Sequence, residues 1–412
     1  MAGSRRFVAC LLLSLFTCST IAGPVVSDVE WERDGWLTTA LADERIELGD
    51  EFGCYGVPGY SWYNDPGAVA KECRSYIENN TIASSWGDNA LSTYAPSGLT
   101  MAQHNYIASQ DFVVHGDNTG LEDTVWHNAT DVPYDNWDWY NIGRRGESLE
   151  KGIGSLETVQ NAVEEGGLVN LYWIGRVNDA TIRHDRDIAE YLQNDAQAWM
   201  TTWGQAWSYW SSNRCYEHSN ILDQEQATFT FSSIVTEQCT SVAPNAWNVP
   251  VTWRLSFHNA TVVDVQDQFG QSMENLTGVR QTAEGWRMDG TELLVSVKRG
   301  TVVTVVLDGE NISFDVHNQT DFWNGYDAAV TIAAHDTTDL FLWSKRFDDE
   351  DQLRFTWLVS PRTIDGRLPW LPYVALVAGV VTIVAMMGVL GREGIGPLAG
   401  VMNKKNLQYE EE

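Results

Sequence analysis

This sequence has little positive charge and very little lysine. Its 412 residues include 56 Asp and Glu against 26 Lys and Arg, and only six of the 26 are Lys. At low ionic strength a net charge of −30 would disfavour a compact fold through self-repulsion. At molar salt the Debye length falls to ~3 Å and this repulsion largely vanishes. The composition therefore favours a protein that works in brine over an ordinary acidic surface protein. It also disfavours nucleic-acid binding, because no basic stripe is available to neutralise phosphates.

The sequence also lacks the short motifs that mark common catalytic sites. It contains no G-x-S-x-G elbow, no H-E-x-x-H, no phosphate-binding glycine loop and no EF-hand loop. Its eight His are scattered, and none lies at metal-ligand spacing from another. We therefore expect that the chain is not an enzyme and that it binds neither a metal ion nor a cofactor. An active site assembled from distant residues is the alternative that motifs leave open.

Long apolar runs are absent except at the two ends of the chain. Arg5 and Arg6 precede a short apolar run and small residues, which is the layout of a signal peptide over residues 1–22. Residues 371–390 carry no charge, and twenty residues at ~1.5 Å each can cross a hydrocarbon core of ~30 Å. Positive charge after this run, from Arg392 onward, places the tail over 391–412 inside and everything before it outside. The sequence thus predicts a single-pass membrane protein with one C-terminal transmembrane helix and its N-terminus outside.

Cysteine is scarce, and two of the six lie within the predicted signal peptide. An even number of cysteines in an exported chain predicts two disulfides, and the spacing favours pairing the first two and the last two of those that remain. Three connectivities are formally possible. Metal binding is the rival interpretation, weakened by the absence of a C-x-x-C pair. The four cysteines are Cys54, Cys73, Cys215 and Cys239.

The segment between the two ends divides into two regions by periodicity. Residues 23–215 are predicted to mix loops and helices, with one helix over 147–165 and a longer Trp-rich helix over 185–210. Four tryptophans of the longer helix recur at three- or four-residue steps, which is typical of a core-facing stripe but would also suit a membrane or oligomer surface. Residues 216–362 change to a period of two, with eight short strands and Asp-Gly turns. We expect an α+β fold whose C-terminal part is an antiparallel β-sandwich-like domain, joined by a connector over 363–370 to the transmembrane helix.

A short apolar run between glycines, GLVNLYWIG, is a candidate membrane-inserting segment. A buried strand or helix would look the same in sequence. Its apolar and aromatic members are Leu168, Val169, Leu171, Tyr172, Trp173 and Ile174.

Six N-x-S/T sequons precede the predicted anchor, and each is a candidate glycosylation site in an exposed loop or strand edge. They begin at Asn79, Asn128, Asn259, Asn275, Asn311 and Asn318.

The combination of signal peptide, acidic ectodomain, helices followed by β-rich sequence, and one C-terminal anchor resembles the spike proteins of haloarchaeal pleomorphic viruses. The resemblance covers the whole chain as architecture. It rests locally on residues 147–210, where ESLEKGIGSLETVQNAVEEGG is followed by DIAEYLQNDAQAWMTTW. Members of that family are virion surface spikes that mediate host attachment and membrane fusion.

The resemblance implies a spike in a virion envelope, with a lipid bilayer and a host receptor or S-layer glycan as partners. The alternative is a haloarchaeal cell-surface envelope or adhesion glycoprotein without fusion activity. The sequence predicts no oligomeric state.

Overall fold

The structure of the chain is a computed structural model. It describes residues 40–82, 90–116, 140–141, 147–149, 152–174, 185–213, 216–235, 249–335, 350–360 and 371–392. By the density of internal contacts, residues 31–362 form one compact unit, and 1–30 with 363–412 form another. The parallel sheet and the antiparallel sheet both belong to the first unit, and the helix α10 belongs to the second.

A parallel sheet organises the first unit. Its strand order is β4-β3-β2-β1-β14-β13-β5, and β6 pairs with β13 beside this path. Every pairing within it is parallel. The strands are β1 (Glu51–Cys54), β2 (Ser92–Tyr94), β3 (Val114–Gly116), β4 (Tyr140–Asn141), β5 (Gly167–Ile174), β6 (Trp199–Thr201), β13 (Ala328–His335) and β14 (Phe355–Val359). The first and last strands in sequence, β1 and β14, are therefore neighbours at its centre.

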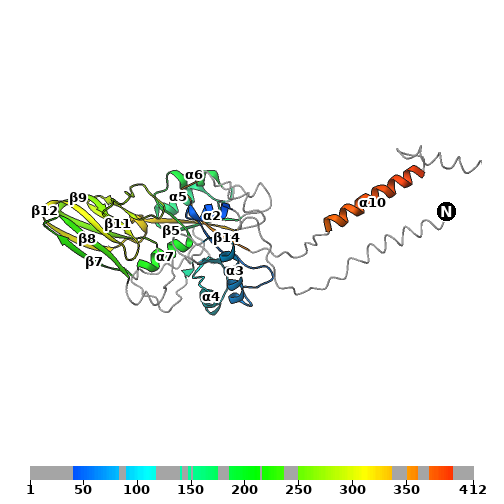
Figure 1. Ribbon diagram of the computed structural model, residues 1–412, viewed down its shortest axis with the longest axis horizontal. Helices are drawn as coiled ribbons and strands as arrows, with labels where there is room; N and C mark the ends of the chain where they lie inside the picture. Colours follow the sequence, from blue (N-terminus) through cyan, green and yellow to red (C-terminus); the bar gives the residue numbers. More distant parts are fainter. Residues whose placement is uncertain are drawn as a thin grey trace, which may run out of the picture. The chain divides into compact units, whose positions relative to one another are not determined.

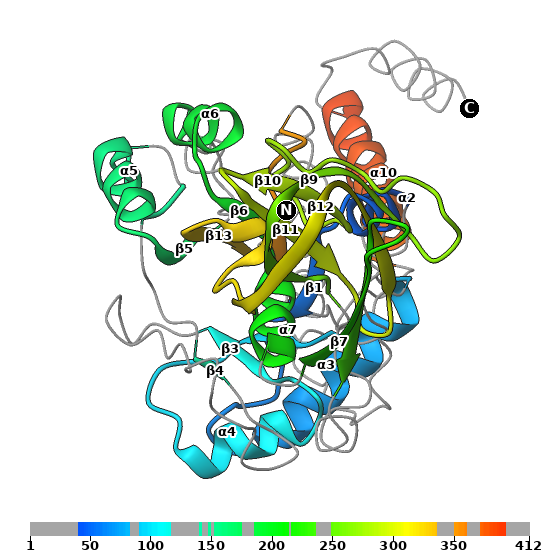
Figure 2. The same ribbon diagram turned by 90° about the vertical axis from the view of Figure 1, so that its left-hand side faces the viewer.

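Side chains that alternate along these strands pack into two separate hydrophobic cores, one on each face of the sheet. In β5, Leu168 joins one core and Val169 the other, because successive side chains point to opposite faces. One face is covered by five helices, each of which contributes apolar side chains to the core on that face. Figure 2 shows these helices around the strands of the sheet. These are α2 (Ala40–Glu47), α3 (Pro66–Asn80), α4 (Met101–Ala108), α5 (Leu156–Glu164) and α6 (Arg186–Asn194).

The opposite face of the parallel sheet is covered by the tryptophans of α7 (Trp203–Asn213). Trp203 is 1% exposed, and a Cβ on Gly116 of β3 would lie 2.0 Å from its ring. Only glycine lets the strand approach the indole this closely. The tryptophans of the predicted stripe are thus part of the hydrophobic core on the face of the sheet that α7 covers.

The predicted continuous helix over 185–210 is wrong. Its residues form α6, then the short strand β6, then α7. The guanidinium of Arg280 caps α6, because it donates to the carbonyls of Leu192 and Gln193 in the last turn and to that of Ala196 just beyond the helix. A new helix begins at Thr202, whose hydroxyl accepts the N–H of Gln205 at 3.3 Å.

A buried carboxylate fixes α7 against the sheet. Glu51 of β1 is 2% exposed and accepts hydrogen bonds from the hydroxyls of Ser92 (2.7 Å) and Thr356 (2.9 Å) and from the N–H of Gly204 (3.0 Å). Burial raises the pKa of the Glu51 carboxyl, and these hydrogen bonds oppose the shift. One side chain thereby joins three strands to the first turn of α7.

The antiparallel part is one six-stranded sheet in the order β10-β11-β9-β12-β8-β7. In Figure 1 the labels of β7, β8, β9, β11 and β12 mark this sheet on the left. Its strands are β7 (Tyr216–Asp223), β8 (Thr228–Val235), β9 (Val251–Gln266), β10 (Gly285–Asp289), β11 (Glu292–Val297) and β12 (Val302–Gln319).

The two longest strands of this sheet, β9 and β12, must bend. Val297 at the end of β11 pairs with Val251, whereas Thr304 near the start of β12 pairs with Gln266. The fifteen residue steps from Val251 to Gln266 would span ~50 Å if the strand were straight, far beyond the reach of the few residues that join β11 to β12. The pairing of β9 with β12 shifts register at three places, and the longest interruption lies between Gly309 and Ser313. We infer that the bend lies at this interruption.

Because of this bend, the two halves of the sheet pack against each other and enclose one hydrophobic core. Phe229 of β8 thereby packs on the rings of Phe257 and Phe314, at centroid distances of 5.2 and 4.6 Å.

The predicted fold class is wrong in its arrangement. Residues before 215 are built on a parallel sheet and are not an irregular loop and helix region. The C-terminal part is not a separate sandwich of two sheets. Its antiparallel sheet ends at Gln319, and β13 and β14 return to pair with β5 and β1. Periodicity identifies strands, but their partners lie far away in sequence.

The second unit contains α10 (Leu371–Arg392), whose described side chains are exposed. Within the described residues, no helix combines the length and the apolar character needed to cross a membrane. The predicted transmembrane helix over 371–390 is therefore not supported, although a helix does form there.

Candidate functional site

A polar groove of about 640 Å³ lies beside the antiparallel sheet, where β12 ends. Its walls are Arg254 of β9, Glu292 of β11, the end of β12 over 316–319 and the segment over 320–327 that leads to β13. It is the candidate site because charged and amide side chains from three strands converge on one hollow.

The segment over 320–327 is held rigidly through the short 3₁₀ helix η2 (Trp323–Gly325). Asn324 adopts a left-handed backbone conformation (φ 58°), and its N–H donates to the hydroxyl of Thr252 at 2.7 Å. Its side-chain amide donates to the carbonyl of Leu276 at 3.1 Å. Trp323 is fully buried and donates to the carbonyl of Ala283. This wall of the groove is therefore preformed.

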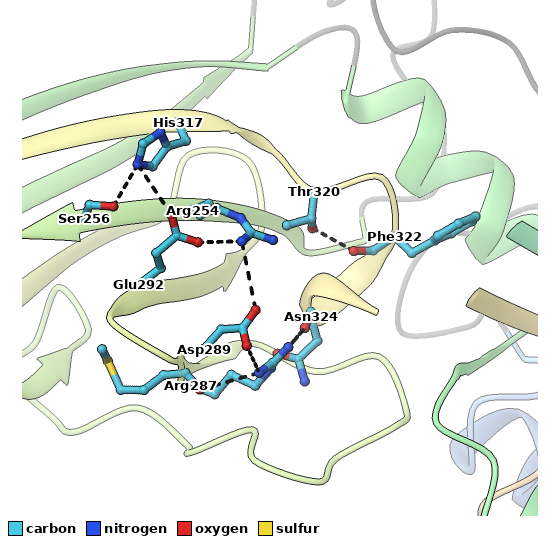
Figure 3. Close-up of polar contacts among 10 residues, drawn as sticks. Arg254, Ser256, Arg287, Asp289, Glu292, His317, Thr320, Phe322 and Asn324 are labelled. Atoms are coloured by element: carbon cyan, nitrogen blue, oxygen red, sulfur yellow. Dashed lines mark hydrogen bonds and ion pairs between the residues drawn. The ribbon is translucent and has the colours of Figure 1, made fainter. Parts of the chain in front are cut away.

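A row of alternating charges begins in the lining of the groove and continues to Asp289 and Arg287, which do not line it (Figure 3). Arg254 lies 2.5 Å from Glu292 and 4.0 Å from Asp289, and Asp289 lies 3.7 Å from Arg287. His317 extends the row, with Nε2 3.8 Å from Glu292. We call these five residues the charge row.

The charge row is partly open to solvent. The side chains of Arg254, Glu292 and His317 are 34, 29 and 42% exposed. Arg287 is anchored at the far end, where its guanidinium donates to the carbonyl of Asn324 at 2.8 Å. Hydrogen-bonding groups in the row therefore remain accessible to a ligand.

The Ser256, His317 and Glu292 side chains do not form a catalytic triad. The hydroxyl of Ser256 lies 2.7 Å from Nε2 of His317, and the nearest Glu292 oxygen approaches the same nitrogen. In a triad the acid holds Nδ1 while Nε2 faces the serine. With both contacts on one nitrogen, Glu292 cannot orient the ring to activate Ser256.

The charges of the groove bear on the kind of ligand it fits. Its lining sets the carboxylates of Glu292, Asp321 and Asp327 against the single guanidinium of Arg254. An anionic ligand is therefore disfavoured. Adjacent donors and acceptors instead suit hydroxyl groups, which both donate and accept hydrogen bonds. Among the described residues, no three His, Cys, Asp or Glu side chains are placed to hold a metal ion.

The structure bears on one predicted disulfide. Cys54 at the end of β1 and Cys73 in α3 are bonded, with their Cα atoms 5.8 Å apart, which confirms that pairing. Cys215 and Cys239 lie outside the described residues.

The candidate membrane-inserting segment forms β5. Leu168, Val169, Leu171 and Trp173 are each at most 4% exposed, and Tyr172 is half-buried. The strand pairs along its whole length with β13, and the side chain of Ile174 lies outside the described residues. In this fold these side chains are core, and insertion would require β5 to leave the sheet.

The asparagines of the predicted sequons are exposed wherever the structure describes them. The asparagines at 79, 259, 275, 311 and 318 are all exposed, and Asn128 lies outside the described residues. Asn318 lines the groove, whereas the other four do not.

Sequence reasoning missed the charge row. A signal was present, since Arg254 and Ser256 alternate with apolar residues along the strand predicted up to Ser256 and so share one face. Their partners on β11 and β12 could not be named, because strand pairing is not readable from one sequence.

Comparison of the chain with protein-family models, with curated proteins and with solved structures finds no match.

Proposed function

We propose that this chain is the surface spike of a halophilic archaeal virus and attaches to its host by binding a hydroxyl-rich glycan in the groove. The observation that carries the proposal is the charge row. The guanidinium of Arg254 and the carboxylate of Glu292 offer donors and acceptors side by side in a groove whose wall over 320–327 is preformed.

High salt favours this mode of recognition over one based on net charge. Interactions between exposed charges are screened within ~3 Å at molar salt, whereas hydrogen bonds at contact distance persist. A neutral sugar recognised by hydrogen bonds would therefore remain bound in the brine that the composition predicts.

A cellular adhesion protein would use the same groove, and the gene neighbourhood distinguishes it, since a spike gene should lie among other virion genes. Membrane fusion stays a prediction. It would require a rearrangement that exposes Trp173 and the other buried residues of β5.

The test is binding of the full chain to immobilised oligosaccharides, both neutral and uronic-acid-containing, in molar KCl. We expect neutral oligosaccharides to bind and Arg254→Gln to weaken binding about tenfold or more, since a charged hydrogen bond contributes ~1.5–3 kcal/mol. Arg299→Gln is the matched control, because Arg299 is exposed in the β11–β12 turn and does not line the groove. Absence of binding, or equal binding by both variants, would contradict the proposal.

A further inference from the structure

The bend shared by β9 and β12 brings two sequons together. Residue 259 begins N-A-T on β9, and residue 311 begins N-I-S on β12. The side-chain amide of Asn259 donates to the carbonyl of Asn311 at 3.3 Å. The two chains are so close that a Cβ on Gly309 would lie 2.1 Å from the carbonyl oxygen of Asn259. We call residues 259–261 and 309–313 the bend.

Backbone geometry explains why Asn occupies positions 259 and 311, but it does not explain the Thr and Ser that complete the two sequons. Asn259 and Asn311 have φ of 60° and 52°, a left-handed conformation that Asn tolerates better than most residues. The hydroxyl residues two positions later, Thr261 and Ser313, are also exposed. Glycan transfer to Asn needs that hydroxyl residue as well as the Asn, so both halves of each sequon are presented together.

In two other described sequons, the hydroxyl group is already engaged in a hydrogen bond to the backbone. Asn79 lies in the last turn of α3, and the hydroxyl of Thr81 donates to the carbonyl of Ile77 at 2.9 Å. In the sequon at Asn318, Thr320 is 8% exposed, and its hydroxyl donates to the carbonyl of Phe322 at 2.7 Å. In the folded chain neither hydroxyl is available to an enzyme.

The fifth described sequon is presented in a turn. The side-chain oxygen of Asn275 accepts the N–H of Thr277 at 2.9 Å, and Thr277 is exposed. This Asx turn holds the Asn and its hydroxyl residue close together on the surface.

We propose that N-linked glycan is carried at Asn259, Asn311 and Asn275, and not at Asn79 or Asn318. Two glycans would then share the bend, where Asp308, Gly309 and Glu310 leave the surface polar and exposed. The groove would stay open, because Asn318 on its lining is not modified. The inference is independent of what the groove binds.

The experiment is glycopeptide mass spectrometry of the full chain, secreted by a halophilic archaeon whose own surface glycoprotein is N-glycosylated in the same culture. We expect glycan on most molecules at the three asparagines and none at the other two. Thr261→Val and Ser313→Ala should each remove one glycan while leaving both asparagines in place. An unmodified bend, or glycan at Asn79 and Asn318 comparable to that at the bend, would overturn the proposal.

Discussion

At the scale of single residues, a buried pair of imidazoles stands out. His115 of β3 is fully buried, and its Nε2 lies 2.7 Å from the carbonyl of Phe112, so Nε2 carries the proton. Its Nδ1 is then the acceptor for Nδ1–H of His104, 2.7 Å away. Burial, and then the neighbouring His104, lower the pKa of His115 to about 3, against a smaller opposing effect of the Phe112 carbonyl. A neutral ring at this position is therefore part of the folded state.

The lowered pKa makes stability depend on pH. Between pH ~6.5 and ~3 the unfolded chain binds a proton at this ring and the folded chain does not, so stability contributed by His115 is present above ~6.5 and lost as pH falls. The loss is about 1.4 kcal/mol per pH unit, or about 2 kcal/mol at pH 5. We expect His115→Gln to lose less stability than the unmodified chain between pH 7 and 5, measured by urea unfolding at each pH. Parallel pH curves for the two proteins would refute this assignment.

At the scale of elements, α6 depends on a residue far away in sequence. The guanidinium of Arg280 donates to two carbonyls in the last turn of the helix, including that of Leu192 at 2.7 Å, and to the carbonyl of Ala196 just beyond it. The carbonyl of Arg280 itself accepts the N–H of Met200 in β6. Burial lowers the pKa of Arg280, although the group stays charged at any ordinary pH. Helix C-terminal carbonyls have no partners within the helix, so a buried cation there satisfies several at once.

Removing this cap should destabilise the fold substantially. We expect Arg280→Met, which keeps much of the apolar stem, to lower the free energy of unfolding by about 3 kcal/mol, since several buried carbonyls lose their donors. The matched control is Arg186→Met on the same helix, whose exposed pairing with Glu190 contributes little. Urea unfolding followed by tryptophan fluorescence measures both. Equal effects of the two substitutions would show that the cap does not stabilise α6.

At the scale of the whole molecule, charge dominates. A net charge of −30 opposes folding unless counterions screen it. The few buried cations have partners inside the fold. Arg45, for example, lies 2.7 Å from Asp50. These cations do little to offset the acidic surface.

The melting temperature should therefore rise steeply with KCl. Each kcal/mol of stability gained raises Tm by about 2 °C for a chain of this size. Sucrose is the control, because it strengthens apolar burial by exclusion from the surface without screening charge. Calorimetric scans across increasing KCl and sucrose should show a larger rise in KCl. A Tm that is flat in KCl would contradict a fold adapted to brine.

The sequence alone determined the features that depend on composition and local pattern. Charge balance follows from residue counts, and alternating apolar residues predicted β-structure at β8, β9, β11 and β12. The short spacing between Cys54 and Cys73 favoured their disulfide. Each of these rests on residues near one another in the chain.

Only the tertiary structure decided which strands pair and where helices end. Ala328 pairs with Gly167 across the parallel sheet, and Arg280 caps a helix 88 residues before it. The charge row likewise joins Arg254 to Glu292 across two strands. Propensity and periodicity describe neighbours along the chain, whereas these contacts come from packing and hydrogen bonding between distant segments.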